Sequence, residues 1–165
     1  MTIDLRQEAQ QFRDWVALKV ADPNRKPSST VGAIVCLFNY DQGGWIALDF
    51  NTDVPFEPDC DVSQTSWDDL LERPAWTPFA CAEDAEPRTF IGLDGVESSV
   101  SAGDVTDDFL CAHFGGMIRE VLTAAWAAGA FSALPLRPGW ELDLWDFNGN
   151  WGWHAVETSG KLVTP

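Results

Sequence analysis

The histidines and cysteines of the sequence do not have the spacing that catalysis or metal binding requires. The two histidines, His113 and His154, lie far apart and lack the H-x-x-x-H spacing of a helical metal site. We expect each imidazole to be hydrogen-bonded and structural, with a shared metal or catalytic role as the weaker alternative. Cys111 and His113 do not suit nucleophilic catalysis, because side chains two residues apart on a helix point in different directions.

One acidic stretch resembles the opening of a calcium-binding loop. Asp59-x-Asp61-x-Ser63 has suitable oxygen ligands, but Gln64 replaces the glycine of the turn and Leu70 occupies the place of the bidentate acid. We therefore expect a solvated acidic loop and neither a metal ion nor a cofactor.

The nine tryptophans and the abundant acids leave a carbohydrate function open. Aromatic rings stack on sugars, and paired carboxylates hydrolyse glycosides. However, twenty-six acids form close pairs by chance, and the C-terminal tryptophans suit the core of a hairpin. No G-x-S-x-G, phosphate-loop or dinucleotide motif occurs. The sequence therefore predicts no catalytic residues and no enzyme.

The acidic charge of the chain is concentrated in one region. From Asp49 to Asp108 there are sixteen acids and only two bases, Arg73 and Arg88, a net charge of −14 out of −16 for the chain. The negative electrostatic field of this region attracts cationic partners and repels nucleic acid and anionic membranes. We call residues 49–108 the acidic region, and we expect it to bind a partner.

The bulk composition suggests one domain, residues 1–165, since 45% of the residues are hydrophobic and the length fits a single core. The first residues lack a basic segment followed by an apolar run, and no apolar stretch is long enough to span a membrane, so we expect a cytoplasmic protein. Cys36 and Cys111 lie in apolar surroundings and should be buried thiols. Cys60 and Cys81 lie in expected loops, where a disulfide between them is disfavoured by a reducing compartment.

The first half of the chain predicts a helix and a hairpin. Apolar residues at three- and four-residue spacing from Ile3 to Val20 indicate an amphipathic helix, which Asp22-Pro23 should end. Residues 31–38 are apolar throughout, as in a strand covered on both faces, and residues 45–50 return beside them.

The acidic region predicts less regular structure. Residues 67–72 suit a short helix, with Thr65 or Ser66 as its cap. Residues 76–87 have the composition of a loop, and residues 89–93 suit a short strand.

The second half predicts a long helix and another hairpin. The helix runs from Asp107 towards Phe131, with Thr106 as its cap and Gly129 as its stop. Gly115-Gly116 within it should allow close packing or a bend. Residues 140–147 and 151–156 flank an Asn-Gly turn and should pair. The expected fold is α+β: an antiparallel sheet built from hairpins and packed against two main helices, the N-terminal one and residues 107–129.

We expect the partner to bind a loop and short helix of the acidic region, because loops on a rigid scaffold commonly carry recognition. Residues 51–72 contain seven acids and no base. Trp67 and Trp76 flank the expected short helix and are candidate anchors, since Trp is enriched at binding hot spots; the alternative is that both belong to the core. The candidate partner-binding residues are Asp53, Glu57, Asp59, Asp61, Trp67, Asp68, Asp69, Glu72 and Trp76.

In its size, acidity and Trp-containing segments, such as Trp67-Asp68-Asp69-Leu70-Leu71-Glu72 and Gly139-Trp140-Glu141-Leu142-Asp143-Leu144-Trp145, the chain resembles the small acidic immunity proteins that bacteria pair with polymorphic or contact-dependent toxins. The resemblance implies one cognate protein toxin, bound tightly so that its active site is blocked, and it implies no catalytic residue. The acidic region would then meet a basic surface of that toxin. Two alternatives remain: a small hydrolase or carbohydrate-binding module that uses Trp and carboxylates, and a structural or regulatory adaptor.

Overall fold

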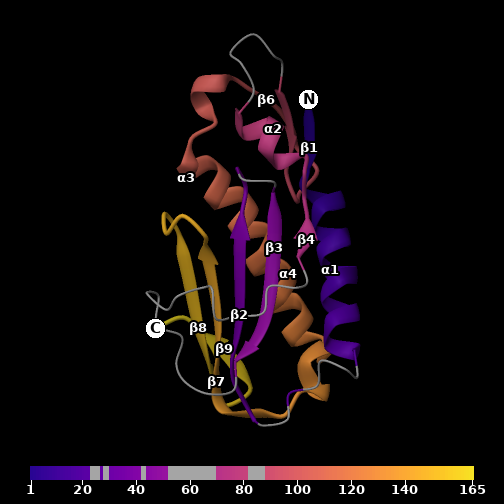
Figure 1. Cartoon of the computed structure of the whole chain (residues 1–165), viewed down its shortest axis with the longest axis vertical. Coiled ribbons are helices and arrows are strands. Elements are labelled where there is room, and N and C mark those ends of the chain that lie inside the picture. Colours follow the sequence, from indigo (N-terminus) through magenta and orange to yellow (C-terminus); the bar gives the residue numbers. More distant parts are fainter. Residues whose placement is uncertain (23–26, 28–29, 42–43, 52–69, 82–87) are drawn as a thin grey trace.

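The computed structural model describes residues 1–22, 27, 30–41, 44–51, 70–81 and 88–165, which form two sheets and a layer of helices (Figure 1). In chain order the elements are β1 (Thr2–Asp4), α1 (Leu5–Ala21), β2 (Val31–Asn39), β3 (Trp45–Asn51), β4 (Leu71–Glu72), α2 (Trp76–Cys81), β5 (Arg88–Ile91), β6 (Glu97–Val100), η3 (Ala102–Asp104), α3 (Asp107–Leu110), η4 (Cys111–Gly115), α4 (Gly116–Ala127), η5 (Ala130–Ala133), β7 (Leu136–Asp146), β8 (Gly152–Thr158) and β9 (Lys161–Val163).

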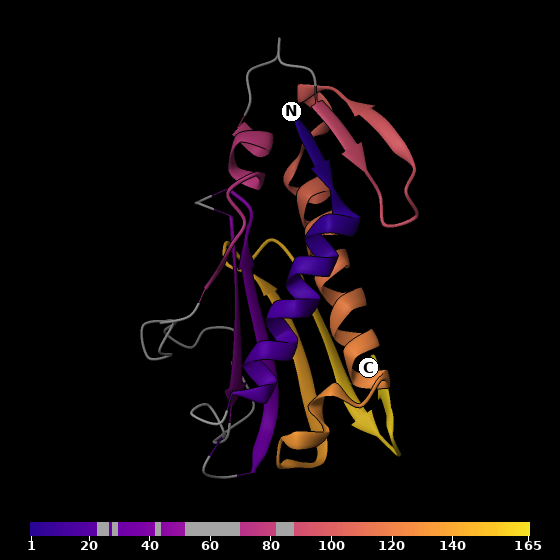
Figure 2. The same ribbon diagram turned by 90° about the vertical axis from the view of Figure 1, so that its right-hand side faces the viewer.

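The larger sheet has six strands in the order β4-β3-β2-β7-β8-β9, and the smaller sheet has the order β1-β5-β6. Helices α1 and α4 lie side by side on one face of the larger sheet, and the smaller sheet lies near the N-terminal end of α1 (Figure 2). The predicted α+β class is confirmed. We call the face of the larger sheet that the helices cover the helix face, and the opposite one the outer face.

The N-terminal helix forms as its periodicity predicts. The side chain of Asp4 caps α1 by accepting a hydrogen bond from the backbone N–H of Arg6 at 3.0 Å. The apolar stripe of α1 is buried, with Phe12 0% and Val16 1% exposed. The helix ends at Ala21, just before the Asp22-Pro23 pair.

Strand β2 is the buried centre of the larger sheet. All nine of its residues are buried, and it pairs antiparallel with β3, which confirms the first hairpin. On its other side, however, β2 pairs parallel with β7. The expectation of a purely antiparallel sheet is therefore wrong: the larger sheet is mixed, because the helices between β2 and β7 form the crossover that a parallel pair needs.

The second main helix is continuous from Asp107 to Ala127, with a π-helical turn at Cys111–Gly115. Thr106 caps it by accepting a hydrogen bond from the N–H of Phe109 at 3.1 Å. Gly129, with a φ of 75°, follows its last turn. Both the cap and the stop agree with the sequence, although the helix ends before Phe131, which belongs to a separate 3-10 turn.

Two local predictions in the acidic region are wrong. Leu71 and Glu72, expected at the end of a short helix, form β4 and pair with Ile46 and Trp45 of β3; residues 67–69 of that expected helix lie outside the described residues. The stretch expected to be a loop contains α2 instead. Burial of Trp76 and Phe79, both 0% exposed, favours the helix over the local composition.

The C-terminal hairpin is confirmed by the antiparallel pairing of β7 with β8. Trp140, Leu142 and Leu144 share the buried helix face, as their alternation predicts. Cys36 and Cys111 are buried free thiols, as expected. Among the described helices, none combines the length and the apolar character that crossing a bilayer requires.

Candidate functional site

The acidic region presents carboxylates to solvent and buries its two bases. Arg73 is 7% exposed and Arg88 is 2% exposed. The described acids of this region that are exposed are Glu72, Asp94, Glu97, Asp104, Asp107 and Asp108. Because the sequence of this region contains no other base, its solvent-facing charge is more one-sided than the composition indicates.

The structure describes two of the nine candidate partner-binding residues, Glu72 and Trp76. Seven of them lie outside the described residues: Asp53, Glu57, Asp59, Asp61, Trp67, Asp68 and Asp69. Glu72 is exposed on β4, at the edge of the larger sheet, where a partner can reach it.

Trp76 belongs to the core, so its assignment as a partner anchor is wrong. It is 0% exposed and stacks on Phe114, with the ring centroids 4.4 Å apart. Its indole Nε1 donates a hydrogen bond of 3.1 Å to Oε2 of Glu8, which satisfies its one polar atom inside the protein. A Trp that is both packed and hydrogen-bonded in this way has no surface left for a partner.

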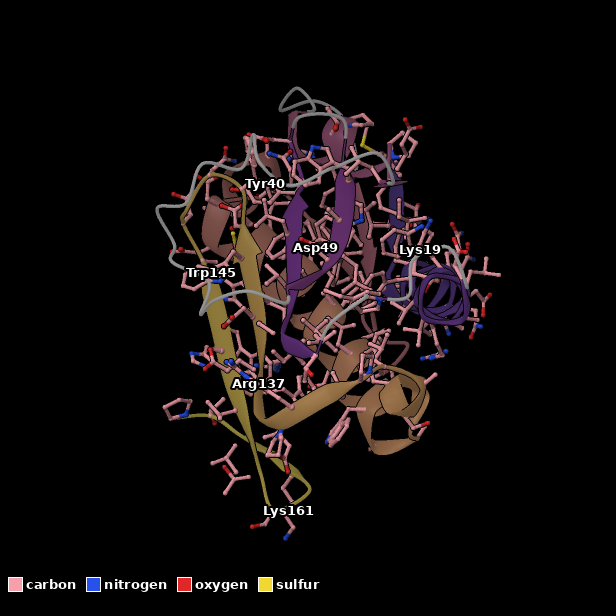
Figure 3. The ribbon with its side chains drawn as sticks, turned by 60° about the horizontal axis from the view of Figure 1, so that its bottom comes forward. Lys19, Tyr40, Asp49, Arg137, Trp145 and Lys161 are labelled. Carbon is pink, nitrogen blue, oxygen red and sulfur yellow. The ribbon has the colours of Figure 1, made fainter. Side chains whose placement is uncertain are left out.

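A row of four side chains, three of them polar, crosses the outer face of the larger sheet. Strand pairing aligns Asp49 of β3 with Val35 of β2, then Val35 with Asp143 of β7, and Asp143 with His154 of β8. Paired residues of neighbouring strands project to the same face, so these four side chains form one row across the sheet. Figure 3 includes this part of the sheet, with Asp49 labelled on β3 and Trp145 on β7.

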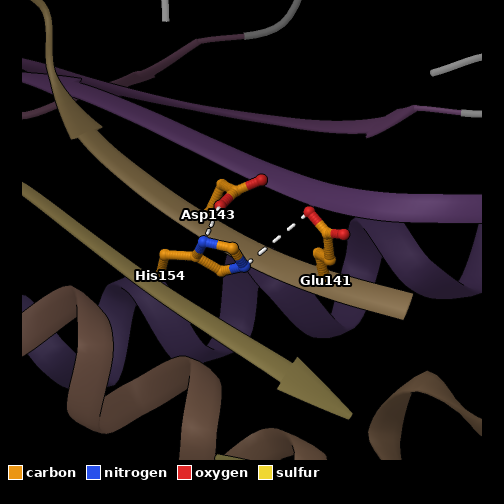
Figure 4. A group of neighbouring side chains, drawn as sticks. All are labelled: Glu141, Asp143 and His154. Atoms are coloured by element: carbon orange, nitrogen blue, oxygen red, sulfur yellow. Dashed lines mark ion pairs between the residues drawn. The ribbon is translucent and has the colours of Figure 1, made fainter. Parts of the chain in front are cut away.

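Two residues of this row, Asp143 and His154, form a cluster with Glu141 (Figure 4). His154 Nε2 lies 3.7 Å from Oε2 of Glu141, and His154 Nδ1 lies 3.8 Å from Oδ1 of Asp143. Glu141 joins the cluster because it lies two residues before Asp143 on the same face of β7. We call these three residues the β7–β8 cluster.

Burial sets the electrostatics of the β7–β8 cluster. Asp143 is only 4% exposed, and loss of hydration raises its pKa to about 6. His154 opposes this rise when it is charged, and the neighbouring Glu141 adds to it. An imidazole between two carboxylates, one of them buried, is a donor set that can share a proton or bind a divalent cation.

A structural role was predicted for His154 because the two histidines lack the spacing of a helical metal site. The signal was instead the alternation Glu141-x-Asp143 on one strand, followed by a hairpin turn that returns His154 opposite Asp143. His113 does have the expected structural role. Its Nδ1 lies 2.7 Å from the carbonyl oxygen of Phe109, and its ring contacts Phe90 at a centroid distance of 4.5 Å.

A second polar cluster lies where β2 and β7 end together. The side chains of Asn150 and Asp107 hydrogen bond to the hydroxyl of Tyr40, which is 1% exposed. Asp146 beside them is 2% exposed; it accepts a hydrogen bond of 3.2 Å from the N–H of Asn150 through Oδ2, while its Oδ1 has no partner among the described residues. Burial raises the pKa of Asp146 and raises that of the Cys111 thiol to about 11. The Asp146 carboxyl and the Cys111 thiol therefore keep their protons to a higher pH than usual. A protonated thiol is a poor nucleophile, so Cys111 does not suit catalysis.

The helix layer also contains an open groove of about 770 Å³ between α1, α4 and β5. Its lining is mixed and includes the apolar Phe90 and Met117 and the basic Arg13 and Arg119. The groove contains neither of the two polar clusters.

Comparison of the chain with protein-family models, with curated proteins and with solved structures finds no match.

Proposed function

We propose that this chain is a binding protein without a reaction of its own, and that it neutralises a cognate bacterial toxin in the cytoplasm by covering a basic surface of that toxin. The observation that carries this proposal is the burial of Arg73 and Arg88. With both bases inside the protein, the acidic region turns only negative side chains towards a partner.

The ion pair of Arg73 strengthens this argument. Arg73 Nε donates a hydrogen bond of 2.6 Å to Oε2 of Glu8, which lies outside the acidic region. The charge of Arg73 is thus compensated internally and does not offset the acids of its own region. A field of one sign raises the rate of encounter with a partner of opposite charge.

The turn between β5 and β6 adds an apolar element to this surface. Leu93 is 41% exposed and Val96 is 63% exposed, and the exposed acids Asp94 and Glu97 alternate with them. Apolar side chains surrounded by charges are typical of binding surfaces, in which the apolar part slows dissociation and the charges steer association. We propose that this turn, Glu72 and the acids of residues 53–69 form the partner-binding surface.

The carbohydrate alternative receives less support. Each of the eight described tryptophans is buried or half-buried. A sugar-binding platform needs an aromatic face that is open to solvent.

The experiment pairs this chain with the protein encoded by the adjacent gene and measures rescue of growth and the association rate at low and at physiological salt. The test variant combines Glu72→Gln with Glu97→Gln, two exposed acids of the proposed surface. Its control combines Asp14→Asn with Glu120→Gln, two exposed acids of α1 and α4 that lie outside the acidic region. Both variants change the net charge equally, so they separate a local surface from the total charge.

We expect the test variant to associate more slowly and with a weaker dependence on salt, while the control behaves like the unmodified protein. If neither growth rescue nor binding is found, or if both variants slow association equally, the proposed surface is wrong.

A further inference from the structure

The β7–β8 cluster has a geometry that the partner-binding proposal does not use. We propose that Glu141, Asp143 and His154 bind one divalent transition-metal ion of the Zn²⁺ class on the outer face of the larger sheet. This assigns to the protein a metal site that the spacing of its sequence does not predict.

The three side chains of the cluster lie close enough together to share one metal ion. The separation of 3.7 Å between His154 Nε2 and Oε2 of Glu141 exceeds the usual length of a hydrogen bond. Two ligands about 2.1 Å from a tetrahedral Zn²⁺ lie roughly 3.4 Å apart. One ligand atom from each residue lies within 4.8 Å of the other two, so small side-chain movements bring all three onto one ion.

The cluster contains a screened polar atom that has no hydrogen-bond partner among the described residues, His154 Nε2. Asp143 is 4% exposed, and its only contact with a cationic group among the described residues is the long one to His154. His154 Nε2 is screened from solvent and accepts or donates no hydrogen bond within the described part of the chain. A screened polar atom without a partner is costly; a metal ion would satisfy Nε2 and would also neutralise the buried carboxylate of Asp143.

The charge of the cluster and its accessibility from solvent also suit a divalent metal ion. Two carboxylates and a neutral imidazole carry a charge of −2, which matches a divalent cation. The side chains of Glu141 and His154 are 24% and 39% exposed, so the ion can enter from solvent although Asp143 is buried. Three protein ligands leave a fourth position of a tetrahedral ion for water. Imidazole together with carboxylate favours Zn²⁺ and its transition-metal neighbours over Ca²⁺ or Mg²⁺.

The test is metal binding by the full chain after removal of bound metal with a chelator. Zn²⁺ is titrated by calorimetry, and Co²⁺ is titrated by its visible absorption, which reports coordination geometry. We expect one equivalent of either ion to bind. Asp143→Asn and His154→Gln should each weaken binding at least about tenfold, since even the loss of an outer-shell partner has that effect. Histidine NMR signals should shift for His154 and stay unchanged for His113.

Two controls separate a built site from the general attraction of an acidic protein for cations. Glu97→Gln removes an exposed acid of β6, and His113→Gln removes the other imidazole; neither should change the stoichiometry or the affinity. Glu141→Gln alters the most accessible carboxylate of the cluster, so it gives a further reading if Asp143→Asn disturbs folding. The proposal is overturned if the cluster variants bind Zn²⁺ as the unmodified chain does, if the control variants weaken binding equally, or if no equivalent binds.

Discussion

Glu8 of α1 and Arg73, the residue after β4, form an ion pair inside the protein. Both residues are 7% exposed, and Arg73 Nε donates a hydrogen bond of 2.6 Å to Glu8 Oε2. The same carboxylate oxygen accepts the hydrogen bond from Trp76 Nε1. The pair therefore joins α1 to the edge of the larger sheet and to α2.

Breaking this pair should destabilise the fold strongly. Glu8→Ala leaves Arg73 charged and unpaired and removes the acceptor of Trp76, so we expect a loss of about 3–5 kcal/mol in the free energy of unfolding. Urea denaturation measures it. The control is Glu120→Ala on α4, an exposed acid for which we expect a change within about 0.5 kcal/mol. Equal effects from the two substitutions would contradict the ion pair.

The neighbouring glycines of the second main helix should respond in opposite directions to alanine. A Cβ at Gly115 would lie 2.8 Å from Cζ3 of Trp151 and 2.9 Å from Cζ of Phe38, so Gly115→Ala should cost about 1–3 kcal/mol through overpacking. A Cβ at Gly116 meets nothing within 4 Å, so Gly116→Ala should stabilise the helix by up to about 1 kcal/mol. Thermal unfolding of the two variants checks this, and a shift of the same sign for both would show that the helix lies differently on the sheet.

The buried Asp146 should make the stability depend on pH. Burial raises its pKa above the ordinary value, with Asp41 and Asp107 adding to the rise, while backbone N–H groups of Asn150 and Asn148 oppose it. A raised pKa means that its contribution to stability is fully present below about pH 4, the pKa in the unfolded chain, and is lost as the pH rises through the folded-state pKa. Asp146→Asn should therefore be more stable than the unmodified protein at neutral pH.

That advantage of Asp146→Asn should shrink as the pH is lowered towards 4, because protonation of Asp146 then removes the difference. Chemical denaturation across this range measures it in both proteins. The exposed Glu97→Gln is the control, and it should show no such dependence. A gain in stability that stays constant with pH would refute the argument.

The buried thiols should be chemically silent in the folded protein. Burial raises the pKa of the Cys36 thiol and raises that of Cys111 to about 11, so the reactive thiolate is scarce near pH 8. We expect neither residue to be alkylated until denaturant is added. Mass spectrometry of the alkylated peptides distinguishes these two cysteines from Cys60 and Cys81, and labelling of Cys111 before unfolding would show that its surroundings open.

The sequence alone determined the elements whose causes are local. The apolar stripe of α1, the Asp22-Pro23 pair that follows it, the Thr106 cap and the Gly129 stop all act within a few residues of the element that they define. The same holds for the two hairpins, because alternation and turn residues depend on neighbours along the chain. These features were predicted correctly for that reason.

Tertiary structure decided what depends on residues far apart in the chain. The parallel pairing of β2 with β7 joins segments more than a hundred residues apart, and no local pattern of either strand specifies it. Trp76 is a core residue because Phe114 and Glu8 surround it, although its neighbours in the sequence resemble a loop. Likewise, Asp143 and His154 face each other only because two strands pair in one register. The burial of Asp143 beside His154, rather than their spacing in the sequence, makes them a candidate site.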